Sequence, residues 1–370
     1  MHFSRSERLE QAMERTGFRS SGFDYLRVAL AASVLLWHAF RTSYPDVAMD
    51  GWQRVPVGLI LPMFFALSGF LISGSLMRVA SIREFLVLRV MRIVPALAVE
   101  IVLSMLLIGA LFSTLPLGEY FTHPDTLSYL KNIYGHIHYF LPGTFQDLPQ
   151  QAVNASLWTI PYELECYLAI VLLWLFRVIR SRSALIGFVV VAQLYVVLNA
   201  VLQGDVMPIT RHVDGRVLVL SFLYGVALYA WRDKVILSGR YVALALVAAG
   251  FMLMDPVGTY FVGLPAAYLT VWLGLMNPRK VGLIASGDYS YGLYLYSFPI
   301  QQAIAHAMGD TRNWLISFVW TMLLAGLCAA FSWHVVEKPI LKQRARIVGA
   351  LDALAAKLAG LKPGQATGAP

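Results

Sequence analysis

Ten apolar runs dominate the sequence, and each approaches the length that crosses a lipid bilayer as a helix. A spanning helix needs about 20 mainly apolar residues. The runs are approximately 23–41, 55–77, 93–115, 157–178, 184–203, 215–231, 240–255, 257–276, 289–308 and 314–335. Because lipid offers no partners to backbone N–H and C=O groups, each run must satisfy its own as a helix. We therefore expect an all-α integral membrane protein, a bundle of about ten transmembrane helices. The turn Met254-Asp255-Pro256 leaves nine or eleven open.

The composition agrees with this class. Hydrophobic residues make up 58% of the 370 residues and charged residues only 14%, whereas a water-soluble domain carries about 25% charge. The two cysteines, Cys166 and Cys328, each lie within an apolar run, so we expect two buried thiols and no disulfide framework. The formal net charge of +8 suits nucleic acid at first sight, but its distribution along the chain gives another reason for it.

Lysine and arginine alternate in number between successive connecting segments. The leader, the tail and the segments after the second, fourth, sixth and eighth runs hold 22 of the 29 Lys and Arg residues. The intervening segments hold six, and Arg27 lies inside the first run. Because cytoplasmic segments carry the positive excess, this split predicts both termini in the cytoplasm. Topology thus explains the basic charge, and we expect the lipid bilayer, not nucleic acid, as the partner.

Three segments flank or interrupt the transmembrane domain, which we place at 23–340. Residues 1–22 form a polar leader of mixed charge, expected to be a short amphipathic helix on the membrane surface. The first run lacks a small-residue cleavage site and is expected to be a retained helix. Residues 116–156 form a long loop on the outer side, and a loop of that length usually serves function. Residues 341–370 are expected to form an amphipathic helix with a disordered end.

Two basic side chains lie inside the first run. His38 follows Arg27 by eleven residues, close to three helical turns, so both project from one face, roughly 16 Å apart along the axis. The predicted topology places Arg27 near the cytoplasmic end and His38 near the outer end. Charge in hydrocarbon is costly, so such a pair marks a functional site by default. The alternative is that both side chains simply reach the two interfaces.

The second and third runs add small and basic residues. Residues 55–77 contain Ser68 among several glycines and serines, which suits close helix packing or a polar contact from Ser68. Arg89 and Arg92 are three apart, hence neighbours on one helical face, just before Pro95 at the expected cytoplasmic entrance of the third run. Paired guanidiniums there suit capture of phosphates, with ordinary headgroup contact as the alternative.

The fourth run contains an acidic residue near its predicted outer end. Trp158 is predicted at the interface, and Glu163 lies a turn or more inside it, at a depth similar to that of His38. Two ionisable groups from distant segments at one depth indicate a shared site.

The remaining candidates carry less information. Tyr291 and Tyr294 lie among other tyrosines of the ninth run, where aromatic residues usually pack. His136 and His138 form a single HxH spacing in the outer loop, and we expect no metal there. The sequence contains no GxSxG elbow and no glycine-rich phosphate loop, so serine-hydrolase and NTPase functions lack support.

Four features follow one another in a specific order. They are Arg27 with His38, FFALSGFLIS at 64–73, RVMRIVP with Arg89 and Arg92, and SLWTIPYELECY with Glu163. With this set, supported by YSYGLYLYSFPIQQ and the late VEKP, the chain from residue 23 to about 339 resembles the membrane acyltransferase-3 family. Within it, the closest resemblance is to bacterial enzymes that O-acylate exopolysaccharide or lipopolysaccharide sugars. Many members carry histidine where this chain has Ser297, so no role is transferred to that position.

The resemblance implies an acyltransferase of the bacterial inner membrane that uses acetyl-CoA or another acyl-CoA and no metal. The donor would approach from the cytoplasm, its phosphates held by Arg89, Arg92 and Arg27. A hydroxyl of a polysaccharide or lipid-linked glycan would arrive from outside, with His38 as catalytic base and Glu163 orienting it or steadying its imidazolium. Acylation of His38 itself is the alternative. The candidate substrate-binding residues are Ser68, Trp158, Tyr162, Tyr291 and Tyr294.

A glycan transporter or flippase is the competing interpretation. Polar groups at mid-depth together with kinked helices also describe a permeation path. Inverted repeats would favour it, and we find none in the sequence. A purely structural scaffold, the third interpretation, leaves Arg27 and His38 unexplained.

Overall fold

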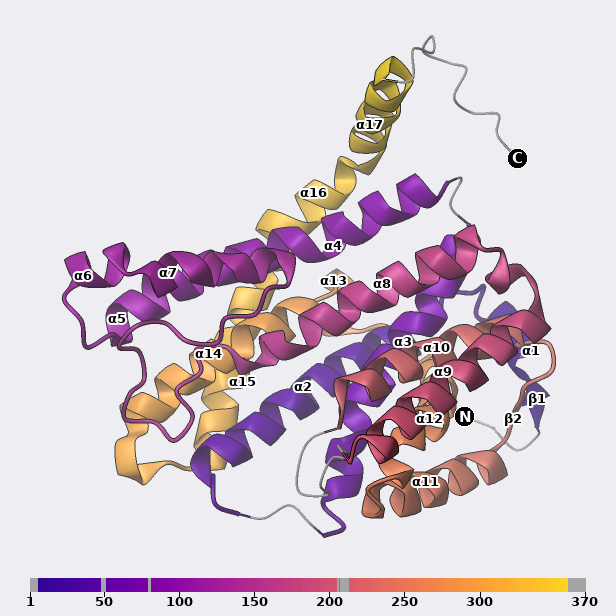
Figure 1. Cartoon of the computed structure of the whole chain (residues 1–370), viewed down its shortest axis with the longest axis horizontal. Coiled ribbons are helices and arrows are strands. Elements are labelled where there is room, and N and C mark those ends of the chain that lie inside the picture. The colour runs from indigo at the N-terminus through magenta and orange to yellow at the C-terminus, as the bar shows by residue number, and fades with distance from the viewer. Residues whose placement is uncertain (1–5, 48–50, 79–80, 205, 207–212, 359–370) are drawn as a thin grey trace.

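Helices make up most of the structure, a computed structural model that describes residues 6–47, 51–78, 81–204, 206 and 213–358 (Figure 1). The first part contains β1 (Glu7–Arg8), α1 (Leu9–Arg15), α2 (Gly22–Ser43), α3 (Arg54–Leu76) and α4 (Ile82–Leu103). The α4 helix continues through a π-helical segment, η1 (Ser104–Gly109), into α5 (Ala110–Phe112). The outer loop contains α6 (Leu117–Thr122), α7 (Pro124–Ser128) and the 3₁₀ helix η2 (Tyr129–Tyr134).

The second part of the chain returns through the bundle repeatedly. It contains the 3₁₀ helix η3 (Ala155–Thr159), α8 (Ile160–Leu175), η4 (Val178–Arg180), α9 (Arg182–Leu202), α10 (Gly215–Ala230), β2 (Ile236–Leu237), α11 (Gly239–Met254), η5 (Gly258–Phe261), α12 (Gly263–Gly274), α13 (Gly282–Ser286), α14 (Ser290–Met308), η6 (Gly309–Thr311) and α15 (Trp314–Phe331). A second π-helical segment, η7 (Ser332–Glu337), leads into α16 (Lys338–Lys342), and α17 (Arg344–Leu358) follows.

The expected all-α membrane class is confirmed in outline. Each of the ten apolar runs is mainly helical in the described residues. Six described helices are long and apolar enough to cross a membrane: 22–43, 54–76, 82–112, 155–175, 182–202 and 314–342. The helices α10 and α11 are apolar but shorter. The number of ten spans therefore stays a prediction.

The third run begins earlier than its hydropathy indicates. The α4 helix starts at Ile82 and passes without a break through Pro95. Arg89 and Arg92 are therefore part of this long helix, and the expected membrane entrance immediately before Pro95 stays a prediction. Ser81 begins the helix by accepting a hydrogen bond from the Glu84 amide at 3.1 Å, which is an ordinary N-cap.

Ion pairs tie together the segments that the charge count assigned to one side of the membrane. Glu10 of the leader pairs with Arg232 after α10 at 3.2 Å, and Arg182 after α8 pairs with the neighbouring Asp233 at 2.9 Å. At the start of α2, Asp24 pairs with Lys280 after α12 at 2.5 Å. In Figure 1 this end, with α1, lies opposite the end that carries α6 and α7. The contacts agree with the predicted grouping, and the direction of the bundle across the membrane stays a prediction.

The leader packs against the bundle through α1, and its expected position on the membrane surface stays a prediction. Leu9 and Ala12 are fully buried and Met13 is 5% exposed. The backbone of β1 pairs with β2 in an antiparallel register, and the Leu9 amide donates to the Val235 carbonyl at 2.9 Å. The apolar face of α1 is thus used to cover protein.

The tail forms the expected helix. In Figure 1, α17 projects away from the rest of the bundle. Residues 359–370, for which the composition predicts disorder, lie outside the described residues.

Glycines allow α3 and α10 to approach closely. A Cβ atom at Gly69 would lie 2.0 Å from the carbonyl oxygen of Phe222, and one at Gly225 would lie 2.1 Å from that of Ala66. Both neighbours are backbone atoms, which no side-chain rotation can move aside. The tight packing face expected for the second run is confirmed.

Replacing Gly69 by alanine is expected to lower the thermal stability of the protein. The added methyl group overlaps the α10 backbone, and overpacking of this kind costs about 1–3 kcal/mol. The matched control is Gly250→Ala in α11, where an added Cβ meets nothing within 4 Å. We expect the control to melt at the wild-type temperature or above, since alanine favours helix. Equal melting temperatures of the two variants in detergent would contradict this packing.

Candidate functional site

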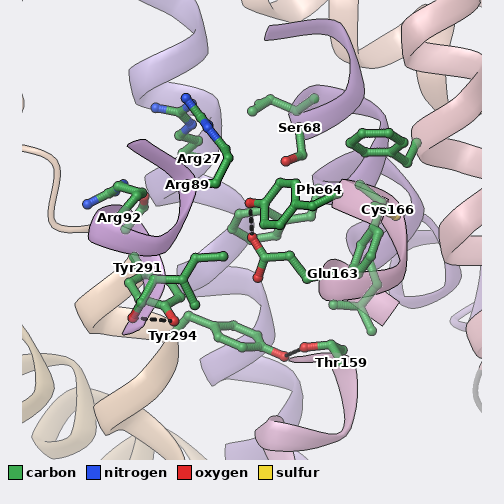
Figure 2. A pocket seen from close by; sticks show the side chains of 17 residues that line it. Arg27, Phe64, Ser68, Arg89, Arg92, Thr159, Glu163, Cys166, Tyr291 and Tyr294 are labelled. Carbon is green, nitrogen blue, oxygen red and sulfur yellow. Dashed lines mark hydrogen bonds between the residues drawn. The ribbon is translucent and has the colours of Figure 1, made fainter. Parts of the chain in front are cut away.

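Three arginines and one glutamate line a small cavity inside the bundle (Figure 2). Its volume is about 140 Å³. Arg27 comes from α2, Arg89 and Arg92 from α4, and Glu163 from the first turn of α8. The remaining predicted residues in its wall are Ser68 of α3 and, from α14, Tyr291 and Tyr294. Seven of the ten residues singled out in the sequence thus converge on one cavity.

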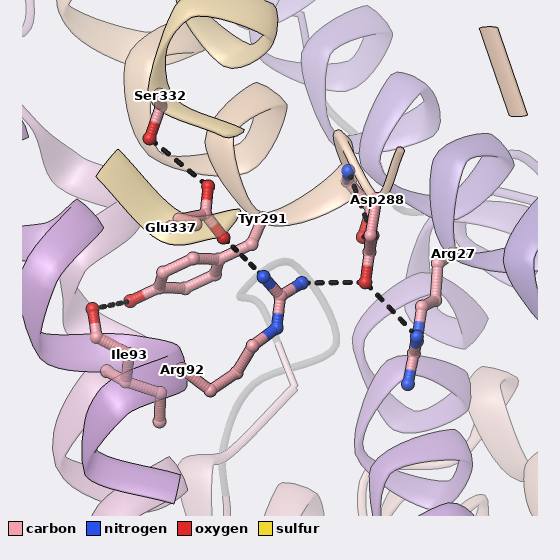
Figure 3. Close-up of polar contacts among 8 residues, drawn as sticks. Arg27, Arg92, Ile93, Asp288, Tyr291, Ser332 and Glu337 are labelled. Atoms are coloured by element: carbon pink, nitrogen blue, oxygen red, sulfur yellow. Dashed lines mark hydrogen bonds and ion pairs between the residues drawn. The ribbon is translucent and has the colours of Figure 1, made fainter. Parts of the chain in front are cut away.

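Two of the arginines are neutralised by carboxylates (Figure 3). Asp288, in the turn before α14, accepts from Arg92 Nη2 at 2.7 Å and from Arg27 Nη1 at 3.2 Å. Arg92 also donates through Nη1 to Glu337 of η7, whose other oxygen accepts from Ser332 Oγ at 3.1 Å. The network joins α2, α4, η7 and the start of α14 at one place.

The charge of Asp288 is set by these arginines. Burial alone would raise the pKa of its carboxyl, but Arg92, Arg27 and the hydrogen bonds from Ser290 hold that pKa at about 2. Since the pKa lies below its ordinary value, the pairing stabilises the fold at neutral pH and is lost only as the pH falls toward 2.

Arg89 differs from its two neighbours. Within the described part of the chain, no carboxylate lies within ion-pair distance of it, and its Nε atom is buried without a hydrogen-bond partner. Its guanidinium lies 5.6 Å from the centre of the Phe85 ring. A buried guanidinium with unused donors in a cavity wall is equipped to bind an anion.

Glu163 faces the same cavity. Its Oε1 atom accepts a hydrogen bond from the Tyr167 hydroxyl at 2.6 Å, one helical turn away. Nearby, the Tyr294 hydroxyl lies 2.7 Å from Thr159 Oγ1 and donates to the Ser156 carbonyl at 2.8 Å. These bonds connect the start of α8 to α14.

His38 lies beyond this cavity, in the walls of two outer ones. The larger has a volume of about 940 Å³ and includes Trp158 and Tyr162 in its wall. The smaller, of about 310 Å³, includes Trp158 and Tyr294. The ring of Phe298 packs edge-on against the imidazole, with centroids 4.9 Å apart. The three remaining predicted residues, His38, Trp158 and Tyr162, therefore gather around these two cavities.

The inner and outer cavities adjoin one another. Leu61 and Tyr294 line both the inner cavity and the smaller outer one. Glu163 and His38 line different cavities, and Glu163 bonds to Tyr167 instead of facing the imidazole across one site. The two residues were predicted at a similar depth in the membrane, but they do not line the same cavity. The reason is that α8 directs Glu163 toward the arginines of α4 (Figure 2).

Sequence reasoning missed several polar residues of this region. Asp288 and Glu337 were not assigned to the site, although each lies next to an apolar run. Glu100, inside the third run, is fully buried and accepts from Ser104 Oγ at 2.7 Å and Asn154 Nδ2 at 2.9 Å. An acidic residue within an apolar run was the available signal for Glu100.

These observations define a class before any comparison. The chain is a helical membrane protein in which a cavity lined by arginines adjoins cavities lined by His38. Ionisable groups inside a membrane bundle mark a protein that acts on polar groups within the bilayer. Residues 20–336 match the family model described as an acyltransferase domain. The chain therefore belongs to the membrane acyltransferase-3 family and is a membrane acyltransferase.

Two curated relatives align along nearly the whole chain. An O-acetyl transferase of Shigella phage Sf6 is 26% identical over 336 residues, covering 87% of this chain and 96% of the relative. Nodulation protein 10 of Rhizobium leguminosarum bv. viciae is 27% identical over 361 residues, covering 90% of this chain and 97% of that protein. No solved structure matches the chain significantly.

Proposed function

We propose that this protein transfers an acyl group, most simply acetyl, from acyl-CoA on the cytoplasmic side to a hydroxyl of a cell-surface polysaccharide or its lipid-linked precursor. The observation that carries the proposal is the row of adjoining cavities, in which Arg27, Arg89 and Arg92 line one end and His38 the other. The relative from phage Sf6 is an O-acetyl transferase, which supports an alcohol as the acceptor.

The inner cavity suits the donor. Phosphates of the coenzyme would meet Arg89, whose donors are unused, while Arg27 and Arg92 line the same cavity, held in place by their carboxylate partners. The inner cavity itself is too small for the whole coenzyme at about 140 Å³, so its pantetheine arm would thread past Tyr294 toward His38. To reach His38, the arm would cross about half of a hydrocarbon layer roughly 30 Å thick.

The outer cavities suit the acceptor. Trp158 and Tyr162 offer aromatic faces near His38, on which a sugar ring can pack. Ser68 and Tyr291, on the inner side, would contact the donor instead.

In the proposed reaction, His38 acts on the acceptor hydroxyl. As the hydroxyl oxygen attacks the thioester carbonyl, the imidazole takes its proton. The carbon–sulfur bond then breaks, the departing thiolate takes the proton from the imidazolium, and the ester remains on the glycan. Attack by His38 itself, followed by transfer from an acyl-imidazole, has the same overall balance. Glu163 would act within the arginine-lined cavity, balancing the positive charge beside the donor.

Mass spectrometry of surface glycan from cells with and without the gene tests the proposal. Ester groups should be present only with the protein. If proteoliposomes carrying it move glycan across the bilayer and no ester forms, the protein is a transporter and the proposal fails.

Replacing Arg89 by alanine is expected to raise the KM for acyl-CoA by about tenfold or more, the value of a charge-assisted contact of roughly 1.5–3 kcal/mol. The KM for the acceptor should change little. The matched control is Arg83→Ala, one and a half turns earlier in α4 and absent from the walls of the cavities discussed here. Steady-state kinetics with labelled acetyl-CoA separate the two constants. An unchanged donor KM would remove Arg89 from the donor site.

A further inference from the structure

The outer loop lines a second cavity, besides the larger cavity of His38 to which it also contributes residues. Its volume is about 460 Å³. Tyr139, Phe140 and Gln151 line both cavities, so the two share a wall. The cavity of His38 therefore adjoins a second one that none of the roles proposed above explains.

The walls of this second cavity are held by hydrogen bonds. Asn132 is fully buried, accepts from the His138 amide at 2.8 Å and donates to the His138 carbonyl at 2.9 Å. The Val153 amide donates to the Tyr139 carbonyl at 2.8 Å. From α14, Gln302 donates to the Ala152 carbonyl at 2.9 Å. Fixed main-chain positions are what a preformed binding site needs.

The lining chemistry suits a neutral ligand rich in hydroxyl groups. Besides aromatic rings, the wall contains Gln146, Gln151 and Thr144, with Asp125 as its carboxylate, and the described residues contribute neither lysine nor arginine to it. The His138 Nε2 atom is buried without a hydrogen-bond partner. Partial burial, with His136 and Lys131 nearby, lowers the pKa of His138, so its ring is neutral at neutral pH.

The combined size argues against a single sugar as the whole ligand. Sites for one small molecule are about 300–1,000 Å³. The larger cavity of His38 already has a volume of about 940 Å³, and the second cavity adds about 460 Å³ beside it. Phe140 lies at the junction and is 60% exposed, which leaves its ring face available for stacking.

We propose that the second cavity is a subsite for sugars adjoining the one that is acylated, so that the acceptor is an oligosaccharide chain and not a single sugar. This inference rests on the proposed function. The neighbouring sugars would pack on Phe140 and hydrogen-bond to His138 and Gln146. Their contacts would hold the chain while one hydroxyl lies at His38.

Acceptor length tests this subsite. The probe is the surface glycan of the bacterium that encodes the protein, de-esterified, cleaved by mild acid and sorted from single sugars to long fragments. With labelled acetyl-CoA and full-length protein in nanodiscs, kcat/KM should rise with length by about fivefold to tenfold, the value of one neutral hydrogen bond and one aromatic contact. His138→Ala and, separately, Gln146→Ala should bring the long-to-short ratio toward one.

Tyr134→Ala is the matched control. Tyr134 is also on the outer loop and is 68% exposed, but it lines neither of the two cavities. This variant should keep the wild-type ratio. A wild-type rate that does not depend on length would overturn the subsite while leaving acyl transfer intact. The same loss of ratio in Tyr134→Ala would also overturn it, since exposed loop aromatics would then act through lipid contact. Absence of acylation at every length would instead refute the proposed function.

Discussion

Replacing His38 by alanine is expected to lower the acyl-transfer rate by about 10²- to 10⁴-fold, the usual contribution of a positioned general base. His38 lines both outer cavities, and among the described residues it is the one histidine in either wall. The amount of protein in the membrane should stay the same, because the side chain is only partly buried at a cavity wall. The measurement is transfer of labelled acetyl from acetyl-CoA to glycan, normalised to protein.

His306→Ala is the matched control for this variant. His306 lies at the outer end of α14, where its Nδ1 atom pairs with Asp147 at 2.7 Å, and it lines none of the three cavities of the site. We expect activity near that of the wild type. Retention of acylation in His38→Ala would remove the base assignment.

Covalent labelling separates the two roles open to His38. With labelled acetyl-CoA and no acceptor, an acyl-imidazole would leave label on wild-type protein and none on His38→Ala. A general base leaves both proteins unlabelled.

Replacing Arg92 by alanine is expected to destabilise the protein by about 3–5 kcal/mol, the cost of removing one partner of a buried ion pair. Its partner Glu337 has a side chain only 1% exposed and would be left without its cation. Asp288 would keep Arg27 as its other partner, at 3.2 Å. Thermal unfolding in detergent and the amount of protein in membranes should both report the loss.

Arg89→Ala provides the contrast one helical turn away. Arg89 has no carboxylate partner among the described residues, so its removal should leave the melting temperature nearly unchanged while it raises the KM for the donor. The double variant Arg92→Met with Glu337→Leu should recover part of the stability, because it removes both buried charges together. Equal melting temperatures for Arg92→Ala and Arg89→Ala would show that the ion pairs of Figure 3 do not hold the fold.

Acidity should affect this network only at extremes. The pKa of Asp288 is held at about 2, below its ordinary value, so the carboxylate stays charged as the pH falls through the mildly acidic range. A loss of activity at mildly acid pH would therefore have its origin in another group, and comparison with His38→Ala identifies it.

The sequence by itself determined the helices and their grouping. Runs of apolar residues must form helices in lipid, because backbone groups find no other partners there. The charge alternation grouped the ends of those helices, and ion pairs such as Glu10–Arg232 agree with it. The i, i+3 spacing of Arg89 and Arg92 correctly placed both on one face of α4, where they line one cavity.

Only the tertiary structure decided which of these groups meet. Arg92 is 196 positions from Asp288 and 245 positions from Glu337, and no local pattern connects residues so distant. Packing also turned Glu163 toward the arginines and away from the cavities of His38, although both lie at similar expected depth. Hydropathy reports how deep a residue lies in the membrane. The neighbour across the bundle depends on helix rotation and close packing, such as the contact of Gly69 with the α10 backbone, and those are properties of the assembled fold.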